Sequence, residues 1–164
     1  MDAAEVDVQV LSPANLVPYL ETQAIAVEAA RILNDGYAEL THRLPKRFKA
    51  YVSLPMPHVD ASLHEMERGL DQLGFVGVHF GCSILDQPVI QKDFEPVYQE
   101  MNRRCAILCF HPVVNSLCSA LLNDFNLAGS VGTTLEDTLV VLHIVIGQVP
   151  HRYPNIKIIV PHFG

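Results

Sequence analysis

Two histidines follow apolar stretches that predict β-strands. His111 lies in "CAILCFHP", residues 105–112, and His162 lies in "IKIIVPHFG", residues 156–164. In parallel α/β folds, functional groups gather where the strands end, at one edge of the sheet. Neighbouring strands lie only ~5 Å apart, so two imidazoles at such ends can converge on one metal ion or one water molecule. Because neutral imidazole is a common metal ligand and a base near pH 7, the pair predicts metal binding or acid–base chemistry.

Simpler interpretations stay open for these residues. A histidine at a strand end is often a hydrogen-bonded structural residue, which applies to both His111 and His162. His79, near the end of the predicted strand 75–80, is interpreted as a packed polar residue. Cys109 shares a strand face with His111, where it is either a thiol nucleophile or, as we favour, a small buried apolar residue.

The elements that must position these histidines alternate along the chain. Apolar periodicity predicts strands at 6–12, 48–55, 75–80, 105–112 and 156–160, and helical segments at 27–44, 60–73, 93–101 and 133–149. Thr133 and Glu136 have the spacing of a capping box, which predicts that the last helix begins there. Each crossover is long enough for a parallel connection, so the pattern predicts an α/β fold with a parallel sheet.

Composition narrows the function classes. The 164 residues are enough for about one domain, and 49% hydrophobic against 18% charged residues argues against disorder. A net charge of −7 without a basic cluster makes nucleic acid and anionic membranes poor partners. The most apolar stretch, 138–149, is about half the length of a membrane span.

Cysteine usage and the N-terminal residues indicate a compartment. Cys82, Cys105, Cys109 and Cys118 form no C-x-x-C pair, which predicts reduced thiols. The first ten residues lack the basic and apolar regions of a signal peptide. A cytoplasmic protein is the expectation.

The ordered set of motifs resembles a known family. "VDVQVLSP", "FEPVYQEMNRRCAILCFHP" and "EDTLVVLHIVIGQVPHRYPNIKIIVPHFG" follow one another in the order and spacing of the amidohydrolase-related family. This family contains metal-dependent hydrolases and decarboxylases, among them aminocarboxymuconate semialdehyde decarboxylases.

The resemblance implies a TIM (β/α)₈ barrel with one divalent metal ion at its C-terminal mouth, usually zinc, with manganese as the alternative. In the family, ligands come from a His-x-His or Glu-x-His on the first strand, a histidine after the fifth and an aspartate after the eighth. A further histidine, after the sixth strand, contacts the metal-bound water or the substrate. By motif, His111 matches the fifth-strand ligand and His162 the catalytic sixth-strand histidine. The segment 112–132 then corresponds to a loop over the mouth.

Against that pattern, residues 1–164 supply strands two to six and form an incomplete domain, without the first strand and the last two. We therefore expect a metal-dependent hydrolase or decarboxylase for a small carboxylic-acid substrate, using a metal-bound water in a barrel completed by another chain, and hence a homo-oligomer. The alternative is a non-catalytic barrel fragment that self-associates or binds partners through its exposed strand edges. An unrelated open α/β domain that binds a small ligand is a third hypothesis.

Overall fold

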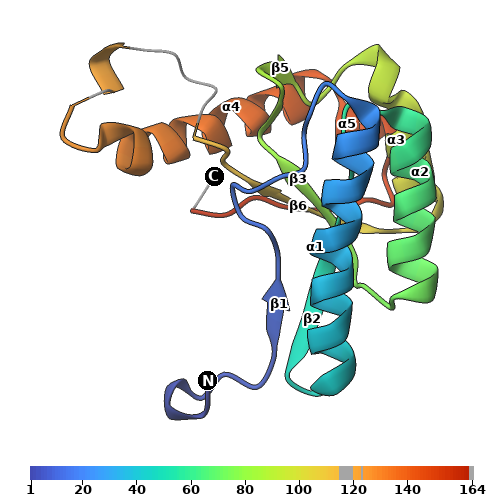
Figure 1. The fold of residues 1–164 in the computed structure, drawn as a ribbon. Coiled ribbons are helices and arrows are strands. Elements are labelled where there is room, and N and C mark those ends of the chain that lie inside the picture. The colour runs from blue at the N-terminus through green and yellow to red at the C-terminus, as the bar shows by residue number, and fades with distance from the viewer. Residues whose placement is uncertain (115–119, 123, 163–164) are drawn as a thin grey trace.

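Five parallel strands form one sheet, in the order β1-β2-β3-β6-β7 (Figure 1). The computed structural model describes residues 1–114, 120–122 and 124–162. The strands are β1 (Gln9–Leu11), β2 (Phe48–Ser53), β3 (Gly77–Gly81), β6 (Ile107–His111) and β7 (Lys157–Ile159). This arrangement confirms the five predicted strands and their parallel direction.

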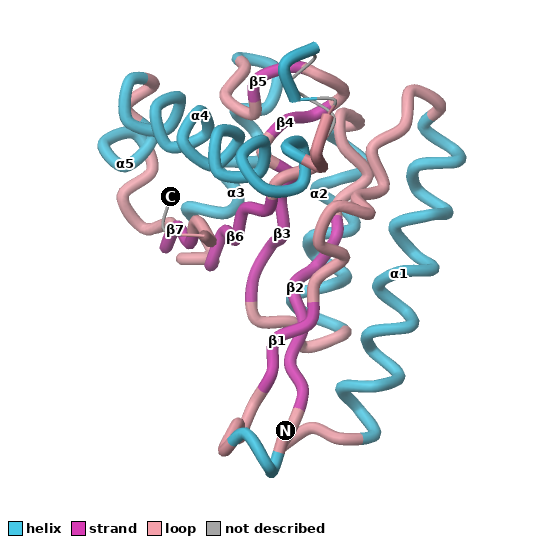
Figure 2. Tube along the Cα trace, turned by 90° about the vertical axis from the view of Figure 1, so that its left-hand side faces the viewer, coloured by secondary structure: helices cyan, strands magenta, loops and turns pink. Residues whose placement is uncertain are grey.

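Helices connect successive strands of the sheet. They are α1 (Gln23–Arg43), α2 (Val59–Glu67), α3 (Glu95–Arg103), α4 (Thr133–Ile146) and the short α5 (Val149–Arg152). In Figure 1, α1, α2 and α3 lie together on one side of the strands, whereas α4 runs across the top, where the strands end. A two-stranded hairpin, β4 (Ser83–Ile84) and β5 (Gln87–Pro88), also lies at the top (Figure 2).

The core forms between the helices and one face of the two central strands. Val78 and Phe80 of β3 pair with Leu108 and Phe110 of β6, and all four side chains are fully buried. Phe80 makes edge-to-face contacts with both Phe110 and Tyr98 of α3, with ring centroids 6.1 Å apart in each pair. Burial of these apolar side chains supplies the main stabilisation of this unit.

The opposite face of the same strands carries the polar groups. Side chains alternate along a strand, so His79 of β3 and Cys109 and His111 of β6 point away from the helix-covered face. In the register, His79 pairs with Cys109 and Gly81 pairs with His111. The pleat that buries the phenylalanines therefore places both histidines on one face.

The start of α4 differs from the predicted capping box. A π-helical turn, Ala128–Gly132, runs directly into α4, and the Thr133 hydroxyl donates to the Ser130 carbonyl at 2.8 Å within this continuous helix. The Glu136 carboxylate accepts the backbone N–H of Val113 at 2.7 Å. Glu136 thus ties the helix to the chain after β6. The helix begins at Thr133, as predicted, but its N-cap residue is Gly132, which makes no side-chain capping hydrogen bond.

Some predicted features fall partly outside the described residues. The predicted loop 112–132 includes residues 115–119 and 123, which the structure does not describe, and Cys118 is among them. The other three cysteines are free thiols, as predicted.

Apolar side chains are exposed at both edges of the sheet and on one helix. Within the described residues, β1 pairs only with β2, and β7 pairs only with β6. Val6, Val8 and Val10 are exposed beside the first edge and Ile159 beside the second. The exposed apolar face of α4 consists of Leu135, Leu139, Leu142, Val145 and Ile146. Unpaired edges of this kind favour association with further strands.

One helix in the described part of the chain, Ala128–Ile146, is long and apolar enough to cross a membrane by length and composition alone. The length arises because the π-helical turn continues into α4, beyond the apolar stretch recognised in the sequence. Helices of proteins outside membranes pass the same test, and Glu136 and Asp137 of this helix are buried.

Gly77 allows β3 and β6 to approach closely. A Cβ atom at this position would lie 2.6 Å from the Ile107 carbonyl oxygen and 2.8 Å from its Cβ. Because the nearest atom belongs to the backbone of a paired strand, we expect Gly77→Ala to lower the free energy of unfolding by ~1–3 kcal/mol, measured by urea denaturation.

Gly36→Ala is the matched control for this substitution. Gly36 lies within α1, and nothing would lie within 4 Å of an added Cβ. This control should raise the free energy of unfolding by ~0.5–1 kcal/mol, because alanine favours helix. Equal stability of the two variants would contradict the close approach of β3 and β6.

Candidate active site

His111 is the last residue of β6 and stands at the carboxyl end of the sheet. Its backbone carbonyl accepts the N–H of Cys82 at 3.0 Å. Its Nδ1 lies 2.8 Å from the carbonyl oxygen of Pro112. A carbonyl oxygen only accepts hydrogen bonds, so this partner assigns the proton to Nδ1 and the lone pair of the neutral ring to Nε2. Histidines that bind metals are held by the same kind of hydrogen bond on their other nitrogen.

His162 lies just beyond β7 and meets His111. The two ring centroids are 5.6 Å apart and the ring planes are inclined by 78°, an edge-to-face contact. The Nδ1 of His162 lies 2.9 Å from Oδ2 of Asp137 in α4. The His162 side chain is 43% exposed, so it is accessible to a small molecule. The structure therefore brings together the two histidines that the sequence singled out.

His79 is a third imidazole beside this pair. Its ring centroid lies 6.2 Å from that of His111, and its Nε2 lies 3.0 Å from the carbonyl oxygen of Ala14. Burial lowers the pKa of His79 to about 4, so the ring is neutral at pH 7. Its Nδ1 is buried and has no hydrogen-bond partner among the described residues. His79 is a packed polar residue, as interpreted from the sequence, but it also borders the site.

Two adjacent acids of α4, Glu136 and Asp137, are buried at this end of the sheet, with 3% and 0% of each residue exposed. Glu136 accepts from the backbone of Val113, as described above. Asp137 lies between two groups, because its Oδ1 is 3.6 Å from the Cys82 sulfur and its Oδ2 faces His162. A buried carboxylate is costly unless it is paired, so these contacts account for its position.

Asp137 is not among the site residues that were predicted from the sequence. A signal for it exists, because the two adjacent acids are the only Asp, Glu, Lys or Arg residues among positions 133–146. Charged residues are rarely fully buried unless paired, so this pair of acids indicates partners near the helix. The partners themselves, Cys82 and His162, lie far away in the sequence.

The described residues supply only part of the ligand set that a metal ion needs. His111 has the hydrogen bond and the tautomer of a metal ligand. Structural and catalytic metal sites take three or four protein ligands. No group of three histidine, cysteine, aspartate or glutamate side chains within the described ranges is placed to hold an ion. A complete ligand set would need donors from beyond these residues.

Cys109 does not have the properties of a nucleophile. Its thiol lies 3.7 Å from the carbonyl oxygen of Phe110, and burial raises its pKa. A raised pKa leaves little thiolate at pH 7. Cys109 is only half-buried, so the structure argues against a nucleophile without confirming the fully buried position that was favoured.

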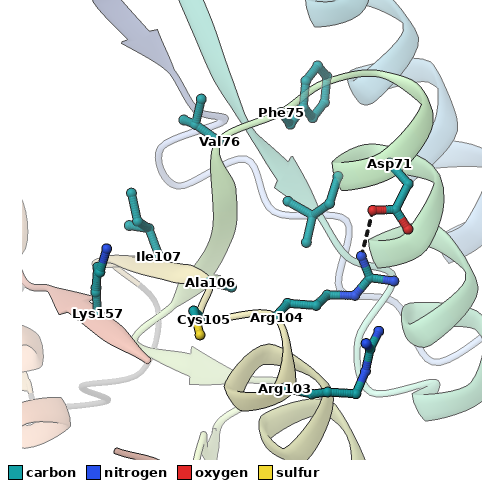
Figure 3. Close-up of a pocket in the computed structure, with 10 residues that line it drawn as sticks. Asp71, Phe75, Val76, Arg103, Arg104, Cys105, Ala106, Ile107 and Lys157 are labelled. Atoms are coloured by element: carbon teal, nitrogen blue, oxygen red, sulfur yellow. Dashed lines mark hydrogen bonds and ion pairs between the residues drawn. The ribbon is translucent and has the colours of Figure 1, made fainter. Parts of the chain in front are cut away.

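A surface hollow of about 580 Å³ lies at the opposite end of the sheet (Figure 3). Ile107 and Lys157, the first residues of β6 and β7, line it. Arg104 also lines it, with its guanidinium 2.7 Å from the Asp71 carboxylate. None of the histidines described above borders this hollow, so it is separate from the candidate active site.

Comparison with curated proteins finds mainly decarboxylases, together with a 2-keto-4-carboxy-3-hexenedioate hydratase of Sphingobium sp. that is 24% identical over 168 residues, covering 96% of this chain and 48% of the relative. A 2-amino-3-carboxymuconate-6-semialdehyde decarboxylase of Dictyostelium discoideum is 29% identical over 161 residues, covering 98% of this chain and 45% of the relative. A gamma-resorcylate decarboxylase of Rhizobium radiobacter is 28% identical over 174 residues, covering 100% of this chain and 53% of the relative. The chain spans about half the length of the curated relatives it matches.

Solved structures share the fold. A crystal structure of an amidohydrolase II superposes with a TM-score of 0.91 at 23% identity, covering 99% of this chain and 53% of the other. A dihydroxybenzoic acid decarboxylase of Polaromonas sp., with bound manganese and an inhibitor, superposes with a TM-score of 0.76 at 21% identity, covering 96% and 51%. These matches confirm the predicted fold class, a partial (β/α)₈ barrel.

The sequence profile of the amidohydrolase family matches residues 1–164, the full length of the chain. This match agrees with the resemblance carried by the motifs around His111 and His162. The chain belongs to the amidohydrolase family.

Proposed function

We propose that this chain forms part of the active site of a metal-dependent decarboxylase for a small carboxylate. The observation that carries the proposal is the edge-to-face contact of His111 and His162 at the carboxyl ends of neighbouring strands. Decarboxylation is favoured over hydrolysis because the relatives described above are mainly decarboxylases. Their names indicate unsaturated or hydroxylated aromatic carboxylates as the substrate class.

His111 is the proposed metal ligand, through Nε2. The Pro112 carbonyl holds the opposite nitrogen, which orients the ring and leaves the lone pair on Nε2. A divalent ion, when bound, supplies positive charge that polarises the substrate and acidifies bound water. The ion is zinc or manganese, and manganese is the metal bound to the Polaromonas protein. Further ligands come from outside the described residues, in a second chain or a longer polypeptide.

His162 is the proposed acid–base residue. Its Nδ1 is occupied by Asp137, so Nε2 is the nitrogen that exchanges a proton with the substrate. In its protonated form, His162 gives this proton to the carbon that carries the carboxylate. The C–C bond to the carboxylate then breaks, its electron pair returns to the unsaturated system, and CO₂ leaves. Solvent reprotonates the partly exposed ring.

A non-catalytic barrel fragment that binds other chains through its edges is the second candidate. The observations that favour it are the exposed valines beside β1 and the incomplete ligand set in the described residues. It predicts self-association without metal binding, which the first experiment below distinguishes.

Metal content tests the role of His111. We expect the purified chain, exposed to zinc or manganese and then desalted, to retain about one ion per chain by elemental analysis. His111→Ala should lose this ion, whereas the exposed His64→Ala should keep it. Wild-type chain that retains no metal above the His111→Ala level would favour the non-catalytic alternative.

Release of CO₂ tests the role of His162. The test compounds are 2-amino-3-carboxymuconate-6-semialdehyde, named for the Dictyostelium relative, and 2,6-dihydroxybenzoate, which is bound to a decarboxylase in another solved structure of this fold. We expect turnover of at least one by the metal-loaded protein, and a loss of kcat by ~10²–10⁴-fold in His162→Gln with metal content unchanged. Undiminished kcat in this variant would refute the assignment.

A further inference from the structure

We propose that Asp137 is a positioning residue that holds the His162 imidazole in one tautomer and one orientation. The inference rests on the proposed function for the role of His162, but the contact itself does not. Asp137 Oδ2 lies 2.9 Å from Nδ1 of His162, and Asp137 is fully buried whereas the histidine side chain is 43% exposed. A fixed carboxylate thus meets a ring that is otherwise open to solvent.

The chemistry of the pair determines the tautomer. A carboxylate accepts hydrogen bonds and donates none, so Nδ1 of His162 must carry the proton. In the neutral ring, the lone pair is then on Nε2. Carboxylates that orient a catalytic histidine in hydrolases act in this way, and loss of the carboxylate leaves the wrong tautomer.

Asp137 belongs to a well-anchored part of α4. Val140 and Ile144 of the same helix are buried in the core, and neighbouring Glu136 binds the backbone of Val113. His162, by contrast, follows β7 in a bend with a left-handed backbone (φ 52°). The helix therefore supplies the rigid partner, and the histidine is the group that is held.

Cys82 supports Asp137 from its other side. The thiol lies 3.6 Å from Oδ1, and burial, together with the charge of Asp137, raises the pKa of Cys82. The sulfur therefore keeps its proton and donates a weak hydrogen bond to the carboxylate. With both oxygens occupied, the carboxylate has little freedom to turn away from His162.

Histidine tautomers can be measured without turnover. We would label the chain with ¹⁵N-histidine and record long-range ¹H–¹⁵N correlations, at a pH high enough that the spectrum no longer changes. The signal of His162 is identified by its absence in His162→Gln. We expect wild-type His162 to be in the Nδ1–H form, and Asp137→Ala to lose this preference in favour of the Nε2–H form.

Two further variants separate a specific effect from a general disturbance. Asp60→Ala removes an exposed carboxylate from α2 and should keep the Nδ1–H form. Asp137→Asn keeps the shape of the side chain but can donate from its amide to Nδ1, so it should lose the Nδ1–H preference. An Nε2–H or mixed tautomer in the wild-type chain would overturn the proposal. So would an unchanged tautomer in folded Asp137→Ala. If Asp137→Ala does not fold, the isosteric Asp137→Asn decides, and an unchanged Nδ1–H tautomer in this variant would overturn the proposal.

The catalytic consequence is measured separately. In the metal-loaded protein, Asp137→Ala should lower kcat on the order of 10²-fold with little change in KM, because binding groups are untouched. If no substrate is turned over but the tautomer responds as expected, the proposed function fails and the positioning contact stands. If turnover occurs, but Asp137→Ala changes neither the His162 tautomer nor kcat, the positioning role fails and the proposed function stands.

Discussion

The parallel pairing of β3 with β6 is the constraint on which both core and site depend. Its register sets Val78 beside Leu108 and Phe80 beside Phe110, which places the large apolar side chains against the helices. Since side chains alternate along a strand, the same register places His79 and His111 on the other face. A shift of one residue would exchange the two faces and bury histidines in the apolar core. Because burying the histidines in the apolar core would be unfavourable, the register specifies on which face of the sheet the site lies.

The second organising element is α4, which crosses the carboxyl ends of the strands and carries two buried acids. Glu136 holds the chain as it leaves β6, and Asp137 holds the histidine that follows β7. Burial of both carboxylates would be strongly unfavourable without these partners. The two ends of the crossover are thus connected through adjacent residues of one helix. This explains how a partly exposed histidine obtains a defined orientation.

Apolar surface remains at β1, at β7 and along the exposed face of α4. In a closed barrel every strand has two neighbours, and the outer helices cover one another's flanks. The five strands described here match about half of each solved relative. The proposed metal site follows the same division, because His111 supplies one suitable donor and the described residues do not supply a set of three. Under the proposed function, completion of the barrel and completion of the ligand set are one structural requirement.

The amino-acid sequence by itself determined the α/β class, the five strands and the two histidines at their ends. These properties are local: apolar runs, turn residues and a histidine placed directly after a strand are visible in short stretches, and parallel strands bring such ends together. The sequence did not determine the partners of those histidines. The spacing of Thr133 and Glu136 predicts the start of α4 correctly, but the contact of Glu136 with the backbone of Val113 depends on the tertiary fold. Asp137 becomes the partner of His162 only through the crossing of α4 over the sheet, since a contact between residues 25 positions apart depends on packing and not on local sequence.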